Sequence, residues 1–391
     1  MTRVAVISPE PTPYRAPLFD RIAAREDVEL TVLYASRSVV GTGWRGELHH
    51  RAQFLRGFRV PGAVRVVRHD YPVTPGVVIA LERIRPDVVV ISGWSTFASQ
   101  AGLAWCRIRR VPYVLLVESH DRGPRAGWRR AVKDAVVPRL VRRAAGVLTV
   151  GSLSRESMLE RGAPPDRIGI FANTIDVAAF RSRAVELGTR RSELRVAFGL
   201  DADDIAVLCV ARLSPEKGLD TLIRAAAAAG PAVKLLLVGD GAERRSLEDL
   251  ARTLDVRATF AGELPWDDIV DAYVASDVFA LLSSRETWGV VVNEAAASGL
   301  PLILSDRVGA APDLLRDGEN GYLVAAGDSD AAASALTALV RDPELRRRFG
   351  DCSSRNVASW GYEPSIESFV EVVQAAAAGA PGANHPGGDG S

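Results

Sequence analysis

The sequence predicts an α/β protein with two Rossmann-like, doubly wound domains that face each other across a cleft. Short runs of apolar, β-branched residues alternate with helical patterns along the 391 residues. This alternation is typical of parallel sheets that helices cover on both faces. Ten such runs are present, which is too many for one ordinary open sheet, so we assign five to each of two domains.

The predicted strands are continuous apolar runs, as expected where both faces of a sheet are buried. They span residues 3–8, 30–35, 87–92, 113–119 and 146–151 in the first half, and 205–212, 233–240, 258–262, 278–283 and 300–306 in the second. Helical patterns lie between them at 17–24, 219–229 and 247–254, and another helix opens near Gly289. Ligands of such sheets bind at the carboxyl ends of the strands, so we expect the chemistry in loops that follow strands.

A polar segment, RSRAVELGTRRSELRVAFGLDADD, separates the two halves, and we place a hinge near residues 183–196. The predicted organisation is an N-terminal domain over residues 1–185 and a C-terminal domain over residues 196–362. A helix at 363–376 is predicted to return to the first domain. Residues 377–391 are small and rich in Pro and Gly, which predicts a disordered tail.

Composition and charge exclude several classes of protein. The chain is 47% hydrophobic and 25% charged, as in soluble globular proteins, and 48 Lys and Arg residues balance 48 Asp and Glu residues. We therefore expect no nucleic-acid partner, and no apolar run approaches the ~20 residues of a membrane-spanning helix. Cys106, Cys209 and Cys352 lie far apart without ligand spacing, which favours a reducing cytoplasm.

We predict no metal and no cofactor. The acidic segment DADD at 201–204 precedes a strand, so it lies at the wrong end of the sheet for a cation bound to a nucleotide.

The stretch SSRETWGVVVNEAAASG predicts a strand end, a loop and a helix that begins near Gly289. The first amides of a helix lack partners within it, and together with the helix dipole they form an anion site. Glu294 lies about one and a half turns into this helix. Burying a carboxylate among valines and alanines is costly unless a ligand binds it, and the diol of a sugar would do so. The alternative is a glutamate on an exposed helix edge.

Two further loops follow predicted strands. In VARLSPEKGLDTLIRA, Arg212 and Lys217 flank a turn ahead of a helix, an arrangement that suits a diphosphate. The alternative is two solvated surface cations. In LLLVGDGAERRSL, Gly239 and Gly241 form a Gly-x-Gly pair, which is weak support for dinucleotide binding because Arg244 occupies the third glycine position.

Together, ARLSPEKG, VGDG, ETWGVVVNEA, GLPLILSD and DGENGYLV resemble the C-terminal half of a family 4 glycosyltransferase (glycosyl transferases group 1), over residues 205–360. The resemblance implies the GT-B fold and a reaction that retains anomeric configuration. It implies that Glu294 binds the ribose, that Glu286 contacts the transferred sugar, and that Arg212 and Lys217 clamp the diphosphate. Other residues implied in donor binding are Thr287, Trp288, Gly289, Val290, Gly239, Gly262, Leu264 and Asn173.

Asn173 lies in ANTIDVAAF, which resembles the Asn-Gly-Val-Asp loop of the family with Thr174 in place of the glycine. The N-terminal half departs further from the common pattern. Many members have two adjacent glycines after the first strand, whereas this chain has SPEPTPYRAPLF and resembles a subgroup with Pro-Tyr-Arg-x-Pro-Leu-Phe. Tyr14 and Arg15 are therefore assigned to the acceptor side.

Many family members also carry His-Asp after the strand that here reads VPYVLLVESHD. In that register Glu118 occupies the acceptor-side position, and His120 is the alternative. Glu118 could instead form a structural ion pair with an arginine of the next helix. The predicted catalytic residues are accordingly Glu286, Arg212, Lys217 and Glu118.

The resemblance implies an enzyme that moves a sugar from a UDP-, GDP- or ADP-linked donor to an acceptor hydroxyl group. The acceptor is a carbohydrate, a lipid-linked molecule or a small molecule, in the biosynthesis of polysaccharides, glycolipids or glycosylated metabolites. The alternatives are a nucleotide-sugar epimerase or phosphorylase of the same fold, a nicotinamide-dependent oxidoreductase and a non-catalytic binding module.

Residues 122–143 have basic residues around an apolar face with helical spacing. Such a helix can lie on an anionic membrane, which would suit a lipid-linked acceptor. The alternative is that its apolar face packs on the sheet. We therefore predict a cytoplasmic protein, with peripheral contact with the inner face of the cell membrane if residues 122–143 bind lipid.

Overall fold

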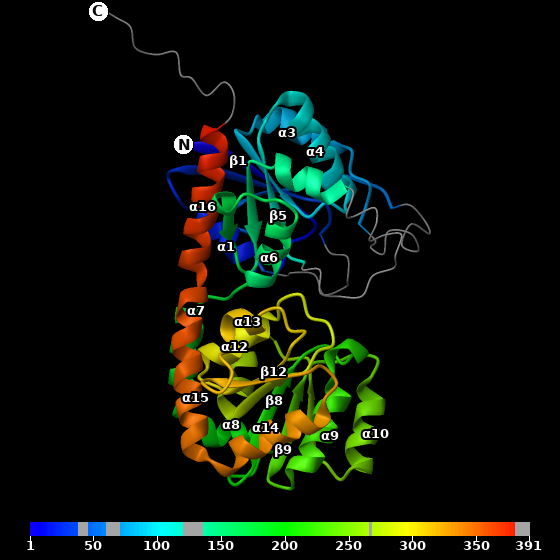
Figure 1. The fold of residues 1–391 in the computed structure, drawn as a ribbon, viewed down its shortest axis with the longest axis vertical. Helices are drawn as coiled ribbons and strands as arrows, with labels where there is room; N and C mark the ends of the chain where they lie inside the picture. The colour runs from blue at the N-terminus through cyan, green and yellow to red at the C-terminus, as the bar shows by residue number, and fades with distance from the viewer. Residues whose placement is uncertain (38–45, 60–70, 120–135, 266–267, 380–391) are drawn as a thin grey trace, which may run out of the picture. The chain divides into compact units, whose positions relative to one another are not determined.

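The structure is a computed structural model of the whole chain, and it describes residues 1–37, 46–59, 71–119, 136–265 and 268–379. The chain divides into two compact units (Figure 1). Unit 1 consists of Met1–Asn173 and Glu363–Ser391, and unit 2 consists of Thr174–Tyr362. Each unit is a doubly wound α/β domain built on its own parallel sheet.

The sheet of unit 1 has the strand order β3-β2-β1-β4-β5-β6-β7. Its strands are β1 (Thr2–Ser8), β2 (Val28–Tyr34), β3 (Arg51–Phe54), β4 (Val88–Ser92), β5 (Tyr113–Val117), β6 (Gly146–Thr149) and β7 (Ile168–Ile170). All pairings are parallel, and β1 lies between β2 and β4 with Val4 opposite both Leu30 and Val88. The direction of winding reverses at β1 and β4, which makes their carboxyl ends the switch point of this sheet.

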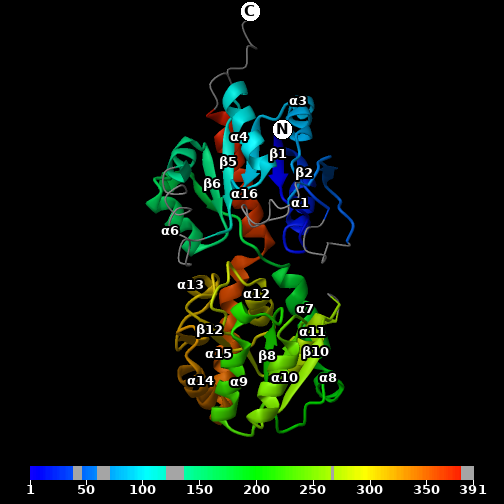
Figure 2. The same cartoon turned by 90° about the vertical axis from the view of Figure 1, so that its right-hand side faces the viewer.

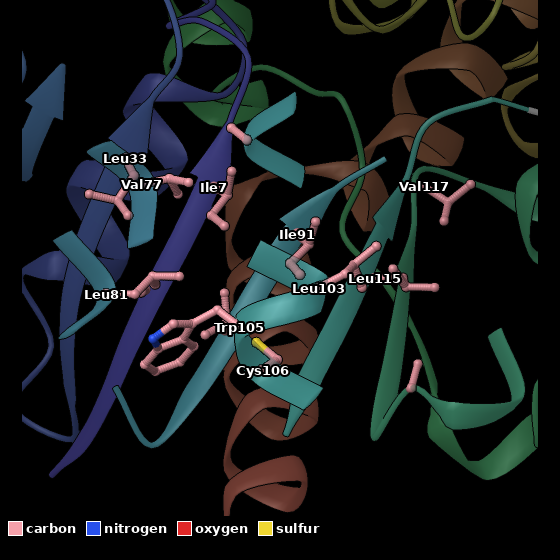
Figure 3. Packing of buried hydrophobic residues seen from close by; sticks show 14 of the residues in the cluster. Ile7, Leu33, Val77, Leu81, Ile91, Leu103, Trp105, Cys106, Leu115 and Val117 are labelled. Carbon is pink, nitrogen blue, oxygen red and sulfur yellow. The ribbon is translucent and has the colours of Figure 1, made fainter. Parts of the chain in front are cut away.

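Helices cover both faces of this sheet, which is why its central strands are apolar. The helices are α1 (Ala16–Ala23), α3 (Gly76–Ile84), α4 (Phe97–Arg109), α6 (Ser152–Glu160) and α16 (Tyr362–Ala378), with the short η1 (Pro165–Arg167) before β7. Figure 3 shows part of the core, where Leu103, Trp105 and Cys106 of α4 lie in one buried cluster with Ile91 and Leu115 of the strands. Residues 136–143 are also helical, and Val137 and Val141 contribute to this core.

The last helix, α16, packs on unit 1 although it is far away in sequence (Figure 2). The ring of Phe369 lies 4.9 Å from that of Phe171, and Ser368 Oγ accepts a 2.9 Å hydrogen bond from the backbone amide of Ile170. Arg25, just after α1, donates to Glu367 at 2.7 Å. The helix therefore closes one face of the N-terminal sheet.

The sheet of unit 2 has the order β10-β9-β8-β11-β12-β13. Its strands are β8 (Ile205–Val210), β9 (Val233–Val238), β10 (Ala258–Gly262), β11 (Val278–Leu281), β12 (Leu302–Ser305) and β13 (Gly321–Val324). The winding reverses between β8 and β11, so the loops after these two strands are neighbours at the switch point.

Helices also cover both faces of the second sheet. They are α7 (Val177–Gly188), α8 (Arg191–Ala197), α9 (Leu219–Ala229), α10 (Arg244–Thr253), α11 (Ile269–Ala275), α12 (Val290–Ala297), α13 (Ala311–Leu314), α14 (Ser329–Arg341) and α15 (Pro343–Asn356), with η2 (Pro215–Lys217) and η3 (Val357–Trp360). Helices α7 and α8 pack against α11, and α14 packs against α9.

All ten predicted strands are present, and β3, β7 and β13 are additional strands at or beside sheet edges. The boundary between units lies at Asn173–Thr174, ahead of the hinge predicted near residues 183–196. That prediction was wrong because the polar residues of this segment form α7 and α8, which pack on unit 2 through buried residues such as Phe180 and Leu194. Helix α16 continues to Ala378, and residues 380–391 of the predicted tail lie outside the described residues.

The basic segment 122–143 is described only from residue 136 onwards, so its predicted contact with a membrane falls largely outside the described residues. In the described part, Val137 and Val141 are buried in the core of unit 1, as the packing alternative expects. Across the described residues, no helix is both long enough and apolar enough to span a membrane.

Candidate functional site

The loops after β8 and β11 form the centre of the candidate donor site in unit 2. The turn η2 lies between Arg212 and Gly218, and the backbone amide of Ser284 donates a 2.8 Å hydrogen bond to the carbonyl oxygen of Glu216. This bond ties the two loops together at the switch point of the sheet. Both loops were predicted from the sequence as strand-loop-helix segments.

Lys217 and Glu286 form an ion pair between these two loops. Each side chain is 17% exposed, so the pair is partly shielded from water and still within reach of a ligand. Arg212 is exposed at the start of the same loop. The structure therefore brings together two of the predicted catalytic side chains, with a third on the same loop.

Helix α12 begins beside this ion pair. Gly289 precedes it with φ +94°, a left-handed conformation that glycine adopts without strain, and no side chain of the described residues caps the helix. Two hydrogen bonds hold the backbone of Glu286. Its amide donates to the carbonyl oxygen of Arg307 at 3.2 Å, and its carbonyl oxygen accepts from the amide of Gly309 at 3.1 Å. Thr287 is exposed and Val290 is half-buried. The loop thus presents the first amides of α12 next to Lys217.

Glu294 is buried, with 2% of its surface exposed, so the alternative of a glutamate on an exposed helix edge was wrong. The hydroxyl group of Tyr273 in α11 donates a 2.6 Å hydrogen bond to Glu294 Oε2. Burial raises the pKa of Glu294 to about 7, and the bond from Tyr273 acts in the opposite direction. Burial, then the neighbouring Glu294, raises the pKa of Tyr273. Tyr273 was not predicted from the sequence because it lies mid-helix and far from any motif.

Gly239 and Gly241 serve backbone packing. A Cβ atom on Gly239 would lie 2.0 Å from the carbonyl oxygen of Ala211, and one on Gly241 would lie 2.3 Å from that of Leu213. The loops after β8 and β9 are also hydrogen bonded, since the amide of Leu213 donates to the carbonyl oxygen of Asp240 at 2.9 Å. Glycine is therefore required where the loop after β9 presses on the loop after β8, and this accounts for the Gly-x-Gly pair without a dinucleotide.

The end of β10 lies next to this loop. The amide of Gly239 donates a 2.7 Å hydrogen bond to the carbonyl oxygen of Gly262, and Leu264 follows as a half-buried residue. Gly262 and Leu264, which were predicted to bind the donor, thus adjoin the loop after β9 in unit 2.

In unit 1, Arg15 forms the centre of a buried cluster. The residue is 4% exposed. Its guanidinium group donates hydrogen bonds to the carbonyl oxygens of Phe171 and Ala172, at 3.1 and 3.3 Å, and to Asn173 Oδ1. It also donates to Glu118 Oε1 at 3.2 Å. Glu118 therefore forms an ion pair with Arg15, which precedes α1. Most arginines of the next helix, which the alternative expected as partners, lie outside the described residues.

This cluster places Asn173, predicted to bind the donor, in unit 1 together with two predicted acceptor-side residues. Tyr14 completes it. Burial and the nearby charge of Glu118 raise the pKa of Tyr14 to about 12. His120 lies outside the described residues.

Two neighbours of this cluster, Glu10 and Tyr71, were not predicted from the sequence. Tyr71 donates a 3.3 Å hydrogen bond to Glu10 Oε1, just after β1. Burial raises the pKa of Tyr71, and the charges of Glu10 and Glu118 add to the effect. Glu10 stands in the SPEPTPYRAPLF segment and follows a strand, a position that could have identified it.

Within the described residues, no group of three or more His, Cys, Asp or Glu side chains is arranged to hold a metal ion. The acidic segment before β8 is used structurally, since Arg257 binds Asp204 at 2.6 Å.

Comparison with known proteins identifies the family of the chain. Residues 190–354 match the family of glycosyl transferases group 1, and residues 11–174 match the glycosyl transferase 4-like domain. The lipopolysaccharide core biosynthesis glycosyltransferase LpsE of Rhizobium meliloti is 36% identical over 236 residues, which are 54% of this chain and 68% of that protein. The chain belongs to the glycosyl transferases group 1 family.

Other relatives match over a smaller share of their length. The D-inositol 3-phosphate glycosyltransferase of Thermomonospora curvata is 32% identical over 229 residues, which are 55% of this chain and 53% of that protein. The sulfoquinovosyl transferase SQD2 of Arabidopsis thaliana is 26% identical over 312 residues, 78% of this chain and 59% of that protein. The chain thus spans about half the length of several relatives it matches.

Solved structures share the fold. Anabaena Alr3699/HepE in complex with UDP has a TM-score of 0.76 at 21% identity, over 96% of this chain and 100% of that one. The sucrose-phosphate synthase of Thermosynechococcus elongatus has a TM-score of 0.72 at 20% identity, over 96% and 98% of the two chains. These similarities establish the GT-B fold.

Proposed function

We propose that this chain transfers a sugar from a nucleotide diphosphate sugar to an acceptor hydroxyl group, with retention of anomeric configuration. The observation that carries the proposal is the Lys217–Glu286 ion pair, which joins the loops after β8 and β11. A ligand that offers a diphosphate to the lysine and sugar hydroxyl groups to the glutamate can separate the two side chains and satisfy both.

Unit 2 binds the donor in this proposal. The diphosphate lies at the first amides of α12, between Lys217 and Arg212, where the positive charge stabilises the leaving group. The ribose hydroxyl groups donate to Glu294, whose other partner is Tyr273. The two cations neutralise the diphosphate, so we propose that transfer needs no metal ion.

The proposed reaction proceeds on one face of the sugar. The bond between the anomeric carbon and the phosphate oxygen breaks while the bond to the acceptor oxygen forms, and the departing phosphate takes the proton of the acceptor hydroxyl group. The protein contributes position and charge stabilisation. Unit 1 holds the acceptor through the polar groups after β1 and β5, including Glu118 and Tyr14.

The names of the relatives support a role in building glycoconjugates, since they include a lipopolysaccharide core enzyme and a sulfoquinovosyl transferase. Solved neighbours were crystallised with UDP and with UDP-glucose, which makes UDP the first nucleotide to test, ahead of GDP and ADP. We propose a carbohydrate, a lipid-linked molecule or a small molecule as acceptor.

A two-stage experiment tests the proposal. Thermal unfolding is first measured with UDP, GDP and ADP, because a ligand that binds the native state raises the melting temperature. The sugar form of the best nucleotide is then incubated with candidate acceptors, with and without EDTA, and the anomeric proton of the product is observed by NMR. Failure of all three nucleotides to bind, or a product of inverted configuration, would overturn the proposal. Turnover that needs no acceptor would indicate an epimerase.

A further inference from the structure

A continuous chain of hydrogen bonds connects the donor loop to the first residue of unit 2. The indole Nε1 of Trp288 donates to Asn293 Oδ1 at 3.0 Å, and Asn293 Nδ2 donates to Thr174 Oγ1 at 3.2 Å. The hydroxyl group of Thr174 in turn donates to the carbonyl oxygen of Trp360. Each step uses a different element: the loop before α12, α12 itself, the segment before α7, and η3.

Three of the four residues in this series of hydrogen bonds are almost completely buried, and Trp360 is half-buried. Thr174 and Asn293 are 0% exposed and Trp288 is 2% exposed. A buried donor or acceptor that loses its partner cannot form a hydrogen bond with water instead. This series of hydrogen bonds is therefore stable only while every bond in it is made. The rings of Trp288 and Trp360 also pack together, with centroids 5.3 Å apart.

Trp288 lies in the middle of the loop that carries the proposed donor-binding groups. Glu286 is two residues before it, and Gly289 directly follows it at the start of α12. The carbonyl oxygen of Trp288 accepts a 2.9 Å hydrogen bond from Ala310, so both its backbone and its side chain are fixed. The orientation of the indole therefore sets how Glu286 and the first amides of α12 are presented.

Thr174 distinguishes this chain from the pattern it resembles. In the Asn-Gly-Val-Asp loop that residues 173–176 resemble, glycine stands at this position and has no hydroxyl group. The bond from Asn293 and the bond to Trp360 both depend on the Thr174 hydroxyl group. A chain with glycine at this position could not form these two hydrogen bonds.

We propose that Thr174 and Asn293 are positioning residues of the donor site, which hold the loop of Glu286 and the start of α12 through the side chain of Trp288. The proposal rests on the proposed function where it concerns the donor, whereas the fixing of the loop can be measured without any ligand.

The test compares three variants. Thr174→Val keeps the shape of the side chain and removes the hydroxyl group, and Thr174→Ser restores the hydroxyl group. Ser353→Ala is a matched control, because Ser353 is also 0% exposed and its hydroxyl group also accepts from an asparagine amide, that of Asn320, at 3.2 Å. The control removes the same type of bond elsewhere in unit 2.

The first measurement is hydrogen exchange of the ligand-free protein. We expect the peptide that covers residues 283–293 to exchange about tenfold faster in Thr174→Val than in the parent, with near-parent exchange in Thr174→Ser and Ser353→Ala. Equal protection of this peptide in all four proteins would overturn the proposal. Faster exchange spread evenly over unit 2 would also overturn it, because it would mark general destabilisation.

The second measurement is turnover of UDP-glucose. We expect kcat to fall about tenfold or more in Thr174→Val, since a small displacement of positioned groups lowers the rate strongly, and to recover in Thr174→Ser. Activity of Thr174→Val within twofold of Ser353→Ala would overturn the proposal. A parent protein that neither binds UDP nor turns over UDP-glucose would instead count against the proposed function for this nucleotide, and the exchange result would still decide whether Thr174 holds the loop.

Discussion

The carboxyl group of Glu294 lies among apolar residues of α12 and accepts a hydrogen bond from Tyr273. A buried carboxylate without a counter-ion favours its protonated form, which explains a pKa raised to about 7. At the residue scale, the sequence could indicate that this glutamate is unusual. It could not indicate Tyr273, which is 21 positions away in the chain and meets Glu294 because α11 and α12 both pack against α7.

The raised pKa predicts a pH-dependent stability. Between about pH 4.5 and about pH 7 the folded protein holds a proton on Glu294 that the unfolded chain releases. The stability that this proton contributes is complete below the pKa of Glu294 in the unfolded chain. It is lost as the pH rises through the pKa of Glu294 in the folded protein. In Glu294→Gln this titration is absent. The free energy of unfolding of the parent, relative to Glu294→Gln, should fall by on the order of 3 kcal/mol across this range.

Urea unfolding at several pH values checks this prediction, with the exposed Glu319→Gln as control. Parallel curves for the parent and Glu294→Gln would mean that Glu294 ionises normally in the folded protein.

The Lys217–Glu286 ion pair predicts opposite effects for its two partners. Glu286→Gln removes the competing carboxylate, so UDP should bind at least as tightly while transfer falls. Lys217→Ala should weaken UDP binding about tenfold or more, because a charge-assisted bond contributes ~1.5–3 kcal/mol. Calorimetry with UDP and an activity assay separate the two effects.

Lys234→Ala is the control for that experiment. Lys234 is a lysine of similar exposure, 16%, paired with Asp204 at the start of the sheet and away from the donor loops. If Lys217→Ala binds UDP as tightly as Lys234→Ala does, the diphosphate is bound by other groups.

At the scale of elements, the strands with long apolar runs could be predicted because helices bury both faces of them. The strands that were missed lack this signal. In β3, residues 51–54 alternate between exposed and half-buried, and β7 consists of three half-buried residues. Such short strands at or beside an edge are defined by their hydrogen-bonding neighbour more than by their own composition.

The donor loop depends on a close backbone contact, which gives a prediction for Gly309. A Cβ atom there would lie 2.0 Å from the carbonyl oxygen of Thr287. Gly309→Ala should therefore displace the loop and destabilise the protein by about 1–3 kcal/mol. Nucleotide affinity should fall as well, since Thr287 lies between Glu286 and Trp288.

Gly188→Ala is the matched control, because no atom lies within 4 Å of a Cβ placed at this end of α7. It should be neutral or stabilise by up to about 1 kcal/mol. Chemical denaturation of both variants, with UDP affinity measured alongside, provides the comparison. Equal stability of the two would show that residues 307–310 can move away from the loop freely.

At the scale of the whole molecule, unit 1 is built from both ends of the chain. The apolar spacing of residues 363–376 predicts a helix with one buried face, and we expected it to return to the first domain. It could not indicate which residues meet. Those contacts, such as Phe369 with Phe171 and Ser368 with Ile170, join positions about 200 residues apart.

This connection predicts that unit 1 needs α16 for its stability. Phe369 is 0% exposed and packs on Phe171, so Phe369→Ala should destabilise unit 1 by about 3–5 kcal/mol through loss of burial and the cavity left behind. Glu371→Ala, on the exposed side of the same helix, should change stability by no more than about 0.5 kcal/mol.

Hydrogen exchange resolved by peptide distinguishes the two units. Protection should be lost in β6 and β7, next to Phe171, and kept in β8 to β13. UDP should still raise the melting temperature of the remaining folded part, because Arg212, Lys217 and Glu294, which bind the donor in the proposed function, belong to unit 2. Equal loss of protection in both sheets would mean that the two units unfold as one, and α16 would then stabilise the whole chain together.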